Sequence, residues 1–317
     1  MFLRRFVLPV VIAVAPAFLA AEEPAAQPEA AAPSAASETA AEEPKTFVDA
    51  LHQAGVKTTD GPASVALGKI AEYKLTEHQH FVGADSLERF YELTENSFGG
   101  NELGVVIDDS GYMLFFEFAD VGYVKDDEKD KLDGDKLMAS MREGQEAANE
   151  HRRDQGWDEM KIQGWAAAPH YDEKTHNLTW AFNLSSSRDN HQSVWINESI
   201  RLLGRGGYMN VTLVADPEQY AAASQATATL LAGNFGYKEG QRYAEWKQGD
   251  KIAAVGLSAL VLGGGAAAAA KLGLLGKLGA LIGKLGKGII LVIAGIGAAI
   301  MKVIRKITGS HPNDPAS

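Results

Sequence analysis

The sequence predicts an α+β domain with a mainly antiparallel sheet and a few helices, followed by C-terminal membrane helices. Strand-like segments outnumber helical ones between residues 45 and 250, and the two kinds do not alternate strictly, which disfavours a doubly wound parallel sheet. Uncharged runs rich in glycine and alanine begin after residue 251. These observations separate a folded domain from a segment suited to a bilayer.

Seven segments have the alternating or continuously apolar pattern of strands. They are 65–73, 103–107, 113–124, 160–167, 178–184, 194–203 and 208–214. Turn-forming residues stand between neighbours at 108–111 and 204–207, where the chain reads Asp-Asp-Ser-Gly and Gly-Arg-Gly-Gly. This spacing favours antiparallel pairing of consecutive strands.

Three further segments have the 3.6-residue apolar spacing of helices. Asp85 is expected to cap a helix that ends near residue 93. A second helix is expected to begin at Asp133 or Asp135 and to run to about Asp154, with charged residues on its exposed side. A last helix is expected over 217–231, starting at a proline.

The N-terminus has the order of a secretory signal peptide. Two arginines precede an apolar run at 6–15 and a stretch of mostly small residues at 17–21. Residues 1–21 are therefore predicted to be a signal peptide cleaved near Ala20 or Ala21. An uncleaved N-terminal anchor is the alternative.

Residues 22–44 are nearly all alanine, glutamate and proline, without aromatic or β-branched apolar residues. Such a segment cannot bury enough apolar surface to offset chain entropy, so a disordered tether is expected. The extracytoplasmic α+β domain is then predicted over 45–250.

Residues 251–307 are predicted to anchor the chain in a membrane, with 308–317 as a short tail. The run 252–270 carries no charge and is just long enough to cross a bilayer core. A second uncharged run, 289–301, is short for a full span. Three arrangements of this region remain open. The first is one span with an interfacial segment, the second is a two-helix hairpin, and the third is a buried core helix at 252–270.

Four glycines between these runs lie on one predicted helical face, opposite a stripe of leucines. They are Gly276, Gly279, Gly283 and Gly286. A bare glycine face lets another backbone approach closely, which favours helix packing in the membrane through self-association or a hairpin. A flexible amphipathic connector on the membrane surface explains the pattern equally well.

The charge of the chain is segregated. Residues 22–250 contain 20 basic and 40 acidic residues, whereas residues from 251 onward carry eight basic residues and one acid. The acidic domain should be repelled by nucleic acids, and the basic tail suits a lipid bilayer with anionic lipids. The absence of cysteine excludes disulfides, thiolate catalysis and cysteine-based zinc sites.

The best candidates for metal ligands are Glu77, His78 and His80. Histidines two residues apart on a strand share a face, and a nearby carboxylate could complete a site. Two exposed histidines at an edge or in a loop are the simpler interpretation. No catalytic residue and no cofactor is predicted, because zinc-protease, Walker A and dinucleotide-binding motifs are missing.

All five tryptophans fall in the second half of the domain. They are Trp157, Trp165, Trp180, Trp195 and Trp246. They could line an apolar groove, although tryptophans on strands more often belong to the core of a sheet.

An ordered series of residues resembles a bacterial family of membrane-anchored proteins, the domain of unknown function 2167 family. The series comprises Gly122-Tyr123-Val124, the helix at 137–150, Gly156-Trp157, Gly164-Trp165, Pro169, Tyr171, Leu178, Trp180, Leu203-Gly204-Arg205, Gly207, Phe235, Gly240, Tyr243 and the Gly/Ala/Lys tail. The resemblance implies a signal peptide, an extracytoplasmic domain and a C-terminal anchor, but no catalytic residues.

The expected function is therefore a membrane-anchored binding module of the bacterial envelope, at the inner membrane with its main domain on the periplasmic side. Its expected partners are the lipid bilayer and an envelope protein, or a second copy through the glycine-rich tail. Two alternatives remain open. One is a metal-assisted hydrolase using Glu77, His78 and His80, and the other is a membrane-perturbing tail regulated by the acidic domain.

Overall fold

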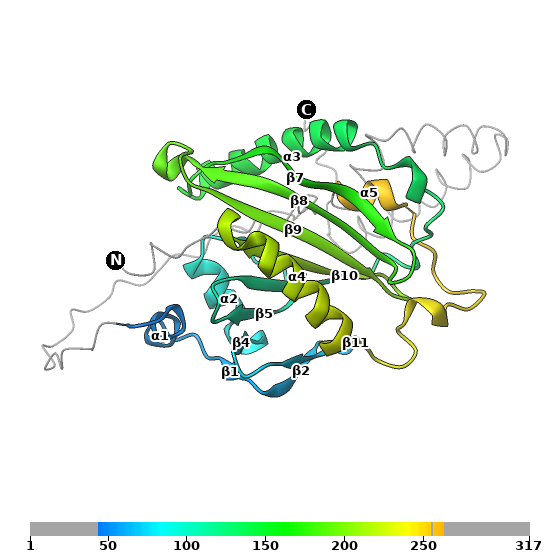
Figure 1. The fold of residues 1–317 in the computed structure, drawn as a ribbon, viewed down its shortest axis with the longest axis horizontal. Helices are drawn as coiled ribbons and strands as arrows, with labels where there is room; N and C mark the ends of the chain where they lie inside the picture. The colour runs from blue at the N-terminus through cyan, green and yellow to red at the C-terminus, as the bar shows by residue number, and fades with distance from the viewer. Residues whose placement is uncertain (1–43, 255, 263–317) are drawn as a thin grey trace, which may run out of the picture. The chain divides into compact units, whose positions relative to one another are not determined.

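The computed structural model describes residues 44–254 and 256–262, which form a large sheet with helices against both of its faces (Figure 1). The helices are α1 (Phe47–Gln53), α2 (Ala84–Leu93), α3 (Gly134–Asp154), α4 (Pro217–Asn234) and α5 (Leu257–Val261). The strands are β1 (Thr59–Asp60), β2 (Ala63–Leu67), β3 (Ala71–Leu75), β4 (Gln79–Val82), β5 (Glu102–Asp108), β6 (Met113–Ala119), β7 (Met160–Asp172), β8 (Asn177–Ser186), β9 (Val194–Leu203), β10 (Tyr208–Ala215) and β11 (Phe235–Tyr237).

The large sheet has eight strands in the order β1-β4-β5-β6-β10-β9-β8-β7. Every pair in it is antiparallel, and so are the pairs of a small sheet ordered β11-β3-β2. The predicted α+β fold with a mainly antiparallel sheet is therefore confirmed. The pair β6–β10 joins the two halves of the large sheet and brings distant parts of the chain together.

Two strand predictions differ from the structure, and three short strands were not predicted. The segment 65–73 is the hairpin β2–β3, because Gly68 takes φ 59° and turns the chain. The segment 113–124 ends at Ala119, and Gly122 then turns with φ 94°. The strand β4 and the short strands β1 and β11 were not predicted, since two to four residues carry too little periodicity to detect.

The helix predictions are close to the structure. The Asp133 side chain accepts a hydrogen bond from the Lys136 amide and caps α3, as expected. The predicted cap of α2 is wrong, because Gly83 is the N-cap and Asp85 lies in the first turn, where its charge favours the helix N-terminus. The helix α1 was missed, although Thr46 and Asp49 form its capping box.

The two faces of the large sheet carry separate apolar clusters. On one face α2, α3 and α5 contribute to a cluster that contains Phe115, Trp180 and Phe182. On the other face α4 and the small sheet enclose a second cluster around Phe116 and Val211. Figure 1 shows α4 lying over β9 and β10 on this second face.

The first residues of the predicted membrane anchor belong to the folded domain. The helix α5 buries Leu257, Leu260 and Val261 completely in the first cluster. The prediction that a membrane span begins at residue 252 needs correction at 257–261, because Leu257, Leu260 and Val261 complete a protein core. The rest of the predicted anchor, residues 263–307, lies outside the described residues together with Gly276, Gly279, Gly283 and Gly286.

None of the helices within 44–254 and 256–262 is long and apolar enough to cross a membrane. The predicted signal peptide at 1–21, almost all of the tether at 22–44 and the tail at 308–317 also lie outside the described residues.

Candidate functional site

The histidines that were predicted as metal ligands lie at one edge of the large sheet. His80 is on β4 and His78 is in the turn before it, and both rings face Asp109. The second partner of His80 is Asp60 on β1, with Nδ1 of His80 2.7 Å from Oδ1 of Asp60. Glu77 contacts only the exposed ring of His78, at 3.4 Å.

The two carboxylates determine the charge of His80. Its Nε2 lies 3.2 Å from Oδ1 of Asp109, so each ring nitrogen faces a carboxylate oxygen. Burial acts to lower the pKa of His80, but the hydrogen bonds to Asp60 and Asp109 outweigh it and raise that pKa overall. The hydrogen bond from His80 in turn lowers the pKa of Asp60. The arrangement stabilises an imidazolium that links β1, β4 and the turn after β5.

A metal ion at His80 would have to displace one of these carboxylates, because a ring nitrogen binds metal only through its free lone pair. In the described part of the chain, no three or more His, Cys, Asp or Glu side chains are placed to hold a metal ion. The ligand roles of Glu77, His78 and His80 stay a prediction. The structure brings His78 and His80 together through Asp109, and Glu77 contacts this group only through His78 in the described residues.

The structure reveals a different polar cluster in the middle of the large sheet, on the face that carries α2, α3 and α5. We call it the sheet-centre patch, and it consists of Glu117, Asn197, Ser199, Arg201, Asn210 and Thr212. Asn210 on β10 lies opposite Arg201 on β9 and Glu117 on β6. Thr212 likewise lies opposite Ser199. Residues opposite one another in antiparallel strands point to the same face, and Asn197, two positions before Ser199 on β9, continues the row on that face.

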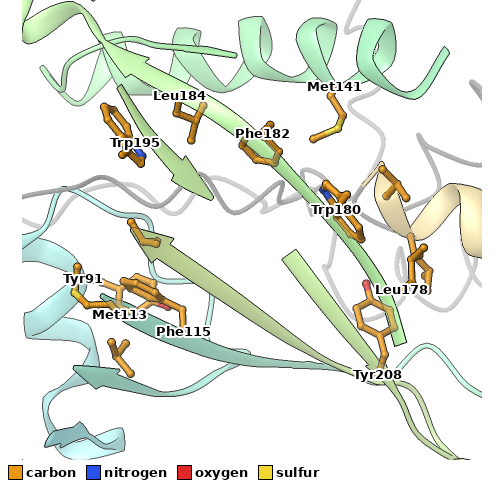
Figure 2. Packing of buried hydrophobic residues seen from close by; sticks show 14 of the residues in the cluster. Tyr91, Met113, Phe115, Met141, Leu178, Trp180, Phe182, Leu184, Trp195 and Tyr208 are labelled. Atoms are coloured by element: carbon orange, nitrogen blue, oxygen red, sulfur yellow. The ribbon is translucent and has the colours of Figure 1, made fainter. Parts of the chain in front are cut away.

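Large aromatic side chains surround the sheet-centre patch. They come from the neighbouring strands and from α2, and they include Trp180, Phe182, Trp195, Tyr208, Phe115 and Tyr91. Figure 2 shows Trp180 and Tyr208 near one another on this face, with Phe182 close to Met141 of α3. Of the five tryptophans, Trp180 and Trp195 are buried in the core of the sheet, Trp157 and Trp165 are half-buried and Trp246 is exposed. The groove interpretation stays a prediction.

Arg201 is the most unusual member of the patch. Its side chain is only 4% exposed, and its guanidinium carbon lies 5.0 Å from the ring centre of Trp180 and 5.1 Å from that of Tyr208. Its Nε and Nη1 are buried and have no hydrogen-bond partner among the described residues. Contact with two aromatic rings offsets only part of the cost of burying a cation, so further acceptors are required.

Other buried polar atoms around Arg201 share this property. Asn197 is completely buried, and both of its side-chain polar atoms lack partners within the described residues, as do the indole N–H groups of Trp180 and Trp195. Asn210 donates to Oε2 of Glu117 at 3.3 Å, whereas its own oxygen is unpaired within the same residues. Donors outnumber acceptors among these atoms, and buried polar groups are normally satisfied.

The chemistry of the patch suits recognition. The Glu117 carboxylate accepts a hydrogen bond from Asn210 at one side of the patch, and Ser199 and Thr212 supply hydroxyls beside it. A guanidinium with amide and indole donors matches an oxyanion, and the aromatic border matches an apolar group beside it.

Sequence reasoning missed Arg201, Asn197 and Asn210 as site residues. The segment 194–203 is predicted as a strand, and its polar residues at 197, 199 and 201 alternate with the face that packs under α4. That alternation was the available clue. It usually indicates a solvent-exposed face, and only the cross-strand register places Arg201 beside Asn210 in the interior.

Comparisons with known proteins give one family and several weak structural likenesses, two of which follow. No curated protein matches the chain. The solution structure of the cyanobacterial PsbP protein (CyanoP) from Synechocystis sp. PCC 6803 matches with 10% identity and a TM-score of 0.34, covering 58% of this chain and 92% of that one. The Saccharomyces cerevisiae Ran-binding protein Mog1p matches with 10% identity and a TM-score of 0.29, covering 57% and 95%.

The family comparison agrees with the resemblance in sequence. The model of the protein family of unknown function DUF2167 matches residues 59–297, which include the whole large sheet and α5. This match covers well over half of the 317 residues. The chain therefore belongs to the DUF2167 family.

Proposed function

We propose that this chain is a membrane-anchored, extracytoplasmic binding module of the bacterial envelope, held at the inner membrane, that binds an anionic ligand at the sheet-centre patch. The placement is supported by the predicted signal peptide, the acidic domain and the glycine- and lysine-rich run at 263–307. The binding role is supported by the buried donors around Arg201.

The observation that carries the proposal is the guanidinium of Arg201. Breaking or omitting the partner of a buried charge costs several kcal/mol, whereas a hydrophobic replacement of similar size is often neutral or stabilising. A residue that lowers stability in this way is expected to be kept for function. The ligand is an oxyanion, a carboxylate or a phosphate ester, with an apolar group that contacts Trp180 and Trp195.

The first experiment compares the full-length protein with its Arg201→Met variant in lipid nanodiscs. Hexyl phosphate, hexanol and inorganic phosphate serve as probes, and the melting temperature is the readout. Hexyl phosphate should raise the melting temperature of the wild type, because binding to the folded state stabilises it. It should not raise that of Arg201→Met, and hexanol should have no effect on either protein. Arg188→Met, which removes an arginine exposed at a sheet end, is the matched control.

The stability of Arg201→Met without probe is equally informative. Its melting temperature should equal or exceed that of the wild type. A fall of about 5 °C or more, equivalent to roughly 1–2 kcal/mol in a domain of this size, would mean that Arg201 is a structural brace. Equal shifts with hexyl phosphate in both proteins would also contradict the proposed site.

The second experiment tests the placement in the cell. The chain lacks cysteine, so single cysteines at Gln192, Gly279 and Ser310 report their own accessibility in intact cells. Labelling of Gln192→Cys from outside the inner membrane supports an extracytoplasmic domain. Labelling at Ser310→Cys as well, without Gly279→Cys, would indicate a hairpin. If Gln192→Cys reacts only after lysis, the proposed location is wrong.

We also propose that the chain has an envelope protein partner or associates with a second copy of itself. Self-association would use the glycine face formed by Gly276, Gly279, Gly283 and Gly286. The close glycine spacing supports helix pairing inside the bilayer. Cross-linking of the Gly279→Cys variant in membranes would detect a second copy. A purely monomeric product would contradict the pairing but not the anchoring.

A further inference from the structure

Two of the three large hydrophobic side chains that are exposed in the described residues lie together at one end of the domain. Trp246 is 37% exposed and Ile252 is 47% exposed. The ring of Trp246 lies 5.4 Å from that of Tyr123, and Ile252 forms an isolated β-bridge with Tyr123. We call Tyr123, Trp246 and Ile252 the aromatic tip.

The aromatic tip is supported from inside the domain. Tyr123 stacks on Tyr243 with ring centres 4.5 Å apart, and Tyr243 lies 4.4 Å from the ring of His176. The hydroxyl of Tyr243 donates to the carbonyl of Val124 at 2.9 Å. This continuous aromatic contact fixes the position of Tyr123, so the tip is held at the surface with its apolar side chains exposed.

A second set of contacts fixes the loop between Trp246 and Ile252. Arg205 donates from Nε and Nη2 to the two carboxylate oxygens of Asp250, at 2.7 and 2.8 Å. The amide of Lys247 donates to the same carboxylate. The hydrogen bond from Arg205 lowers the pKa of Asp250 to about 2, so this acid stays ionised and paired at neutral pH.

The charge of this region differs from that of the rest of the domain. Residues 238–252 contain four basic and three acidic residues, and one of the acids is Asp250 in its pair with Arg205. Lys247 and Lys251 flank the tip; the Lys251 side chain is 65% exposed, donates to the carbonyl of Asp120 at 3.0 Å and lies 3.8 Å from the exposed Asp120 carboxylate. Tryptophan with lysine on one surface is typical of groups at the boundary between hydrocarbon and water.

We infer that the aromatic tip inserts into the headgroup layer of the bilayer and orients the domain on the membrane; this inference rests on the proposed anchoring. Trp246 and Ile252 enter the boundary region, and Lys247 and Lys251 contact lipid phosphates. The segment assigned to the anchor begins eleven positions after Ile252 at residue 263, so the chain keeps this surface within reach of the membrane.

The test measures depth with a fluorophore on single cysteines. Full-length Ile252→Cys, Gln192→Cys and Gly279→Cys are labelled with an environment-sensitive dye and reconstituted into phosphatidylcholine vesicles with a minor fraction of phosphatidylglycerol. Quenching by lipids carrying a nitroxide near the headgroup is then recorded. Gln192 is the exposed control, and it lies in the turn between β8 and β9. The aromatic tip is near the other end of β9, where Gly204 pairs with Arg242. Because β9 has ten residues, the two ends of this strand are about 30 Å apart.

We expect quenching at residues 252 and 279 and no quenching at residue 192. The dye at residue 252 should also have a blue-shifted emission. Adding Trp246→Gln to the Ile252→Cys protein should then reduce the quenching at 252 at least about twofold, since tryptophan supplies much of the interfacial affinity. Quenching at 279 alone would overturn the inference and leave the anchor intact. Quenching at neither 252 nor 279 would overturn both the inference and the proposed anchoring, and equal quenching at 192 and 252 would overturn the orientation.

Discussion

At the scale of single residues, the hydroxyls of Tyr237 and Tyr91 show how hydrogen-bond partners determine the contribution of a polar group to folding stability. The hydroxyl of Tyr237 donates to the carbonyl of Leu202 at 2.6 Å and accepts from the amide of Met209 at 2.8 Å. It therefore joins the ends of β9 and β10. The hydroxyl of Tyr91 is buried and has no hydrogen-bond partner in the described residues.

Replacing these tyrosines by phenylalanine should give opposite results. Tyr237→Phe leaves a backbone donor and acceptor unpaired, so we expect a loss of about 1–3 kcal/mol in the free energy of unfolding. Tyr91→Phe removes a desolvated hydroxyl without breaking a bond, so stability should be unchanged or higher. Equilibrium unfolding in urea measures both, and a larger loss for Tyr91→Phe would contradict these assignments.

His80 predicts a pH dependence of stability. Its pKa is raised in the folded state, so its contribution is complete below the unfolded value of about 6.5 and is lost as pH rises through the folded value. Asp60 has a lowered pKa, so its contribution is present above about 3.8 and is lost as pH falls. The stabilisation from the pair should thus be greatest between these limits.

Urea unfolding of the wild type and of His80→Gln at several pH values tests this dependence. The difference in stability between them should be largest near pH 5 and should shrink above pH 7. A difference that grows with pH would contradict an imidazolium at His80.

The cap of α3 was predicted from the sequence, whereas the cap of α2 and the whole of α1 were not. Asp133 caps α3 because a cap needs only its own helix, and that information is contiguous. Arg201 was not predicted, because its surroundings depend on the register of β9 with β10 and β8. Cross-strand partners more than about ten residues apart cannot be derived from periodicity alone.

At the scale of elements, the β9–β10 hairpin depends on a close approach between backbones. A Cβ atom on Gly207 would lie 1.9 Å from the carbonyl oxygen of Ala119, at the end of β6. The neighbouring Gly206 has open space at the same position. The sequence shows a Gly-Arg-Gly-Gly turn, but it does not show which of its glycines meets β6.

The two glycines should therefore respond differently to alanine. Gly207→Ala forces β6 and β10 apart, and we expect it to cost about 1–3 kcal/mol or more of folding stability. Gly206→Ala should change stability by less than about 0.5 kcal/mol, as expected for a surface substitution. Thermal unfolding of the two variants compares them directly, and equal melting temperatures would contradict the predicted contact with Ala119.

Strand and helix types were largely predictable from periodicity, and boundaries were not. The long strands β8, β9 and β10 were recognised because ten or so residues carry a clear pattern. The hairpin β2–β3 was read as one strand, since Gly68 is small enough to fit either interpretation. The helix α5 was assigned to a membrane span because buried protein core and lipid favour the same apolar residues.

At the scale of the whole molecule, the membrane placement rests on segments outside the described residues. If residues 1–21 are a cleaved signal peptide, the protein purified from membranes should start at Ala21 or Glu22. Intact-mass measurement distinguishes this from a full-length chain. A mass that includes Met1 would favour the uncleaved N-terminal anchor, and a label at Gln192→Cys would still report on which side the domain lies.

The burial of α5 bears on the order of events during biosynthesis. Its side chains Leu257, Leu260 and Val261 are completely buried, and three such burials are worth about 5–9 kcal/mol, comparable to the net stability of a typical domain. A nascent chain that has emerged only to residue 250 lacks this contribution. We expect a fragment ending at residue 262 to fold and one ending at residue 250 to be degraded by proteases, so the domain completes its folding only once residues 257–261 are available to pack into its core.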